Sequence, residues 1–214
     1  MDIQTNKWVG GIGTLLFIIG CVAFFSPVVG GLLELIGIIL VLVALNGFAD
    51  FYKEKGIFNN ALYSVIILIV GMAITFGIGI YIAVGFFESL GLDLTNLQSF
   101  QSVDWANLMT PDKIMELLGD FIIPIVTMMI VIFVFLIIAM FFLRKSLDLL
   151  AVKTGTKMFG TTGLIFLIGA VLTIIFFIGF ILIFVALILL MISFFTVKTP
   201  ESKSEAPQTP KQTV

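Results

Sequence analysis

The chain has 214 residues, of which 60% are hydrophobic and 11% charged, with a mean hydropathy of +1.25 and a formal net charge of -2. A soluble domain is about 45–50% apolar and about 25% charged, so a soluble fold of this size is excluded. The acidic balance gives no reason to expect nucleic-acid binding. The chain lacks histidine and has one cysteine, Cys21, which excludes Ser-His-Asp and Cys-His catalysis and an intrachain disulfide. We therefore expect no enzyme, no metal site and no cofactor.

Long apolar segments follow one another along most of the chain. A helix needs about 20 apolar residues to cross the ~30 Å hydrocarbon layer of a membrane. The first such segment follows Lys7 and has no small-residue cleavage site after it, so we expect a retained span rather than a signal peptide. The sequence predicts an all-α, polytopic transmembrane bundle of about six helices, with spans at 8–25, 28–49, 62–87, 121–143, 157–176 and 178–197.

The last two of these spans divide an uncharged run from Gly163 to Phe195. As one helix this run would be about 50 Å long, at ~1.5 Å per residue, which tilt rarely accommodates. A helical hairpin with its turn near Phe177–Gly179 fits better. One long helix and a re-entrant helix remain as alternatives.

An internal repeat favours the hairpin. The segment IGIILVLVAL at 36–45 resembles IGFILIFVAL at 178–187, and the segments before them share the spacing of one lysine and two glycines. The second hairpin is about seven residues shorter at its turn. The pattern predicts two related hairpins, in parallel orientation, flanking a central helix pair. The alternative is chance similarity, because isoleucine, leucine, valine and glycine dominate both segments.

The basic residues indicate the orientation. All of them except Lys113 fall in aqueous segments on one side of the predicted spans. Since lysine and arginine are retained on the cytoplasmic side, we expect both termini in the cytoplasm and the loop 88–120 outside the cell. The tail 199–214 contains three prolines among polar residues and is expected to be disordered.

Two further segments carry local helix signals. Thr110, Pro111 and Asp112 form a good helix start, which predicts a short amphipathic helix within the loop, lying on the outer membrane surface. The acids of this loop indicate either a solvated loop or a vestibule that attracts cations. Inside the cell, the fourth span is expected to continue over 144–152, with Arg144 and Asp148 paired.

Three residues form the candidate intramembrane polar site. Glu34 is the one ionisable residue well inside a span, where an acid is costly and is usually paired, neutralised or functional. Asn46 and Asp50 share a face near the inner end of the same helix, about 120° away from Glu34. Glu34 could be a proton or cation site, or a carboxyl group that snorkels to the outer interface. For Asp50, a role as an anchor at the membrane interface is a simpler interpretation than a functional site.

A stripe of small residues marks the third span. Its members recur at every fourth position, a spacing that lets another helix approach closely. The stripe could serve packing within the chain or an interface between subunits. It consists of Gly71, Thr75, Gly79 and Ala83.

Two segments carry a resemblance to a known family. LNGFADFYKEKGIFNNALYSVI at 45–66 and RKSLDLLAVKTGTKMFGTTGLIFLIGAVLTII at 144–175 resemble the archaeal and bacterial membrane family catalogued as domain of unknown function 996. The resemblance runs from about Lys7 to Lys198 and is weakest over 88–120. It implies an archaeal cell membrane but no activity and no site residues.

The sequence therefore leaves three functional hypotheses. The first is a non-catalytic accessory or scaffold subunit, or a membrane-organising homo-oligomer, with the lipid bilayer and a membrane protein or a second copy as partners. The alternative is a small transporter or channel that uses Glu34 as a proton or cation site, which requires a polar cavity reaching Glu34. An enzyme acting on lipid ranks last, because it would need several carboxylates converging at one membrane face.

Overall fold

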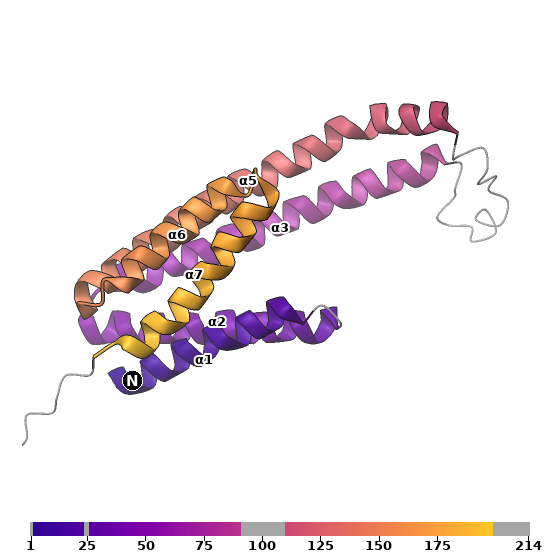
Figure 1. The fold of residues 1–214 in the computed structure, drawn as a ribbon. Coiled ribbons are helices and arrows are strands. Elements are labelled where there is room, and N and C mark those ends of the chain that lie inside the picture. The colour runs from indigo at the N-terminus through magenta and orange to yellow at the C-terminus, as the bar shows by residue number, and fades with distance from the viewer. Residues whose placement is uncertain (1, 24–25, 91–109, 199–214) are drawn as a thin grey trace, which may run out of the picture.

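The computed structural model describes residues 2–23, 26–90 and 110–198, and these residues form six α-helices without any strand (Figure 1). Five helices are long and apolar enough to cross a membrane, and α6, with 15 residues, is shorter. The predicted all-α, polytopic transmembrane bundle is confirmed. The helices are α1 (Ile3–Val22), α2 (Pro27–Tyr52), α3 (Lys55–Ser89), α5 (Pro111–Thr154), α6 (Met158–Leu172) and α7 (Phe176–Thr196).

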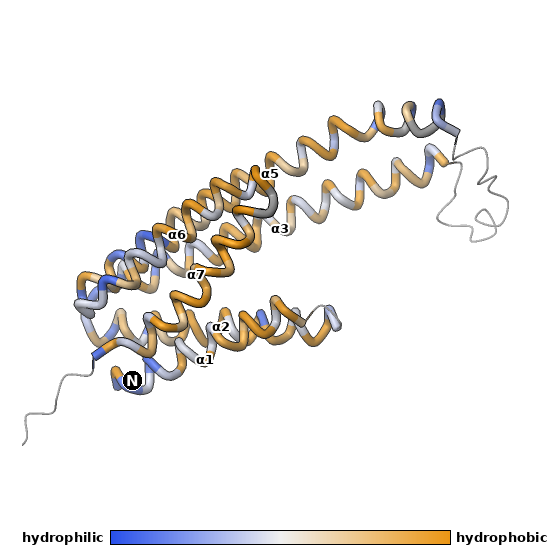
Figure 2. Tube along the Cα trace, in the orientation of Figure 1, coloured by the Kyte–Doolittle hydropathy of each residue, from blue (hydrophilic) through white to orange (hydrophobic). Residues whose placement is uncertain are grey.

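The helices form a closed ring. Each packs against the next along the chain, and α7 returns to α1. Figure 1 shows α7 crossing from the end of α6 to the start of α1. The N-terminus, the α2–α3 turn, the α5–α6 turn and the end of α7 lie together at one end of the molecule, which we call the basic end (Figure 1). Figure 2 shows hydrophilic residues gathered there.

The uncharged run from Gly163 to Phe195 is a hairpin and not one long helix. Its turn covers 173–175, a few residues before the predicted turn at Phe177–Gly179, which was therefore placed wrongly. The Thr173 hydroxyl donates to the Ala170 carbonyl at 2.6 Å where α6 ends. Gly179 lies inside α7, and a Cβ there would overlap the Thr173 nitrogen. The glycine thus allows the start of α7 to pack on the end of α6, rather than forming the turn.

In each hairpin, a glycine of the first helix lies close to the backbone of a glycine in the second helix. Gly20 in α1 faces the backbone of Gly30 in α2, and Gly169 in α6 faces the backbone of Gly179 in α7. The aligned glycines of the second helices lie at different levels, since Gly37 follows the start of α2 by ten residues and Gly179 follows the start of α7 by three. This difference agrees with a second hairpin about seven residues shorter. Duplication itself stays a prediction.

Helix α5 begins where the sequence predicted and extends beyond the fourth span as expected, but it replaces the short amphipathic helix that was predicted in the loop. It begins at Pro111 with Thr110 as its N-cap, as predicted, but continues unbroken for 44 residues, so the separate short amphipathic helix is wrong. Even Pro124 does not end it, because a helix in an apolar medium has no water to satisfy the backbone groups that a break would free. The helix extends past 143 to Thr154, and Arg144 Nε lies 3.5 Å from Asp148 Oδ2. The expectations for the rest of the loop (91–109) and for the tail (199–214) lie outside the described residues.

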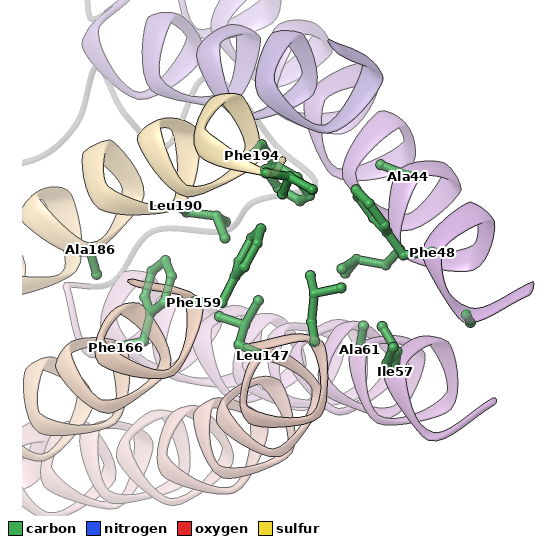
Figure 3. Close-up of a cluster of buried hydrophobic side chains, with 14 of the residues drawn as sticks. Ala44, Phe48, Ile57, Ala61, Leu147, Phe159, Phe166, Ala186, Leu190 and Phe194 are labelled. Carbon is green, nitrogen blue, oxygen red and sulfur yellow. The ribbon is translucent and has the colours of Figure 1, made fainter. Parts of the chain in front are cut away.

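The buried core lies toward the basic end (Figure 3). The Phe194 ring of α7 packs against Phe159 of α6 and Phe48 of α2, with centroid distances of 5.3 and 6.2 Å. Polar contacts join the same end: Lys7 Nζ donates to the Val197 carbonyl at 3.2 Å. In the described parts of α3 after Gly71 and of α5 before Ala139, every residue is at least partly exposed. We call these parts, 72–89 and 111–138, the arm; Figure 1 shows it extending beyond the other helices.

Candidate functional site

Glu34 lies in the contact between α1 and α2. Its side chain is half-buried, and Gly20 of α1 leaves the space that it occupies, since a Cβ on Gly20 would come within 2.7 Å of Glu34 Cγ. The Cys21 thiol interacts with the Glu34 carboxyl group. Glu34 lines none of the three cavities described below, so none of them is the polar cavity that the transporter hypothesis requires. Helix packing around a small residue accounts for the position of this acid.

Asn46 and Asp50 are both exposed on α2 and line one open hollow of about 300 Å³. Gly47 of the same helix and Phe58 of α3 contribute to its wall. Glu34 is absent from this hollow, in agreement with its expected position on a different face. The structure therefore brings two of the three candidate polar residues together and leaves the third apart.

The small-residue stripe on α3 is divided in two. Gly71 is buried against α5, where a Cβ would come within 2.7 Å of the Phe135 Cβ. The Thr75 hydroxyl is also buried and has no hydrogen-bond partner among the described residues. Gly79 and Ala83 line a groove instead, and Gly79 has open space where a side chain would be. Only the half of the stripe nearer the basic end is thus used for packing within the described chain.

This groove runs between the two helices of the arm and has a volume of about 580 Å³. Its walls are almost entirely apolar. The Phe86 and Phe121 rings meet edge to face across the helix pair at 5.6 Å. Elsewhere on the arm, the Phe76, Tyr81 and Ile123 side chains are 71–75% exposed.

The sequence reasoning missed Asn6. Its side chain is fully buried at the basic end, against Gly47 of α2, and neither amide atom has a hydrogen-bond partner among the described residues. Asn6 precedes Lys7, so it was assigned to the aqueous N-terminus. No local pattern could have revealed its burial, because the contact with Gly47 joins two segments that are far apart in the sequence.

A second missed feature is a cavity at the centre of the ring, lined by residues from all six helices. Its volume is about 160 Å³. Among the described residues, no three acids or cysteines cluster as metal ligands would. The convergence of carboxylates that a lipid-modifying enzyme would need is likewise not found in the described ranges.

The ring of apolar helices, with its polar residues toward one end, defines a multi-pass membrane protein of the helical-bundle class. The chain belongs to the family of proteins of unknown function DUF996, which matches residues 33–188. It is similar to an uncharacterised protein of Methanocaldococcus jannaschii, MJ1644, with 29% identity over 197 residues, covering 92% of this chain and 93% of that protein. No solved structure matches the chain. The resemblance seen in segments 45–66 and 144–175 is thereby confirmed.

Proposed function

We propose that this chain is a non-catalytic membrane protein that organises an assembly by binding a further transmembrane helix in the groove of the arm. The observation that carries the proposal is the unused half of the small-residue stripe, where Gly79 and Ala83 face open space between α3 and α5. The partner helix belongs either to a second copy of the chain or to another membrane protein.

Two physical arguments support this assignment. Lipid tails are as apolar as leucine, so helices associate in a membrane through close van der Waals packing, which small residues permit. Gly71 shows this packing inside the chain, because the Phe135 side chain lies directly against it. Two turns along the same stripe, Gly79 offers the same surface, and no described residue occupies it. A helix that filled the groove would gain the dispersion contacts that its walls now lack.

A matched pair of substitutions on α3 tests the proposal. Gly79→Leu would fill the groove, whereas Gly77→Leu, two residues away, would add the same side chain to an exposed face outside it. Native mass spectrometry of protein extracted gently from its own membrane should show a discrete complex for the wild type and Gly77→Leu, and a smaller species for Gly79→Leu. A homo-oligomer identifies a second copy as partner, and a hetero-complex identifies a subunit role. A monomer in all three proteins would overturn the proposal.

The transporter alternative has less support. It requires a polar path to Glu34, and none of the three cavities described above includes this side chain. The central cavity is apolar, and the hollow beside Asn46 and Asp50 lies on the outer surface of α2. No observation in the described ranges therefore favours a conduction pathway.

We also propose that the basic end faces the cytoplasm, as the distribution of lysine and arginine predicts. A cysteine-free variant, Cys21→Ser, provides the background for single reporter cysteines. Lys157→Cys at the start of α6 should react with an impermeant maleimide only after the cells are permeabilised, and Asp112→Cys near the start of α5 should react in intact cells. The opposite pattern would reverse the orientation, and labelling of both in intact cells would contradict it.

A further inference from the structure

The central cavity is closed toward the basic end and less closed away from it. On each of three helices, the lining residue nearer the basic end is buried and the one farther away is half-buried. These pairs are Leu45 and Ile38 on α2, Ala61 and Leu68 on α3, and Leu190 and Ile183 on α7. Figure 3 shows the packed side chains of the closed end, and Figure 1 shows the α1–α2 pair diverging from the arm in the other direction.

The cavity is unsuited to water. Only two of its lining residues, Thr14 and Ser64, carry polar side chains. The Thr14 hydroxyl already donates to the Gly10 carbonyl of its own helix at 2.8 Å. A buried water needs two to four polar partners, and apolar cavities of about 150 Å³ stay dry and take up benzene or xenon. At about 160 Å³, this cavity has the size and the chemistry of such a site.

We propose that the cavity binds the end of a hydrocarbon tail of a membrane lipid, inserted between the α1–α2 pair and the arm. For a chain whose helices lie in lipid, hydrocarbon is the medium at the open side of this space. An empty cavity would forfeit the dispersion contacts of its walls, and water could not restore them. A lipid tail restores these contacts without any polar group having to be buried. The site is separate from the groove of the arm, and its test is independent of the assembly state.

Photochemical labelling tests the inference on the full chain. The protein is reconstituted in phosphatidylcholine vesicles containing a phosphatidylcholine with a diazirine at the end of one acyl chain. After irradiation, mass spectrometry of peptides should find label on lining residues such as Met140 and Leu187, which are only 7% and 8% exposed. Label confined to the exposed outer faces of the helices would overturn the proposal.

Filling the cavity should remove this label. In Ala61→Phe the new ring occupies the space, so most of the labelling of the lining residues is expected to be lost. The control Ala73→Phe places the same ring on an exposed position of α3 and should leave the label unchanged. If Ala61→Phe aggregates, the smaller replacement Ser64→Leu serves the same purpose. Undiminished labelling in a folded cavity-filling variant would contradict the inference.

A second probe distinguishes the source of the hydrocarbon. A free alkane carrying the same diazirine is added to vesicles of unlabelled phosphatidylcholine. Labelling of the lining residues by the phospholipid supports a lipid-tail site, whether or not the alkane also reacts. Labelling by the alkane alone would show that the cavity accepts small apolar molecules but not a lipid tail, and the proposal would fail.

Discussion

Replacing Asn6 by leucine should stabilise the protein. The Asn6 side chain is fully buried, and both of its amide atoms lack a hydrogen-bond partner among the described residues. Burying such a group costs about 1–3 kcal/mol by protein mutational data. Leucine also branches at Cγ and has nearly the same shape, so it removes the polar atoms with little change in packing. For a chain of this length, a gain of 1 kcal/mol raises the melting temperature by about 2–4 °C.

The assay is thermal unfolding in detergent, followed by intrinsic fluorescence and by loss of the monodisperse peak in size-exclusion chromatography. Asn60→Leu is the matched comparison, because the Asn60 side chain is only 8% exposed but donates from Nδ2 to the Gly56 carbonyl at 2.6 Å. This substitution removes a hydrogen bond and should lower stability by about 0.5–1.5 kcal/mol. The same chemical change is thus expected to have opposite signs at the two positions.

Asn6→Asp distinguishes the effect of side-chain shape on stability from the effect of side-chain polarity. It keeps the shape of asparagine but introduces an ionisable acid into an apolar site, so it should destabilise the protein. The reasoning is refuted if Asn6→Leu lowers the melting temperature as much as Asn60→Leu does. That result would mean that the Asn6 amide has a partner in the folded protein, and that its burial is not an uncompensated cost.

Three further predictions concern stability and use the same assay. Gly37→Ala should destabilise the protein strongly, because the new Cβ would lie 2.7 Å from the Gly13 carbonyl oxygen of α1. The control Gly31→Ala adds a Cβ in open space on the same helix, so it should be neutral or slightly stabilising. Ser146→Ala should cost about 0.5–1.5 kcal/mol, since the buried Ser146 hydroxyl donates to a backbone carbonyl of α3 at 2.5 Å; an unchanged melting temperature would mean that this bond contributes nothing. Lys153→Gln should lower the stability by less than about 1 kcal/mol, because the 3.1 Å ion pair of Lys153 with Glu54 is partly exposed. A larger loss of stability that persists in high salt would contradict a solvent-screened surface pair.

Local chemistry explains what the sequence predicted correctly. The apolar composition requires a membrane protein, and the start of α5 at Pro111 follows from the capping pattern of neighbouring residues. The Arg144–Asp148 pair follows from a spacing of four residues on one helix. The split of the last apolar run followed from a length limit and a repeat. Each of these features depends on residues close together in the chain or on the thickness of the bilayer.

Only the tertiary structure decided which helix faces are internal. The return of α7 to α1, the central cavity, the burial of Asn6 and the groove beside Gly79 all depend on contacts between distant segments. In a soluble protein the periodicity of apolar residues would have indicated these faces. Here the helices are apolar around most of their circumference, because lipid replaces water as the solvent. The sequence by itself therefore determined that the chain forms membrane helices and roughly where they begin, whereas close packing at particular glycines decided how they fit together.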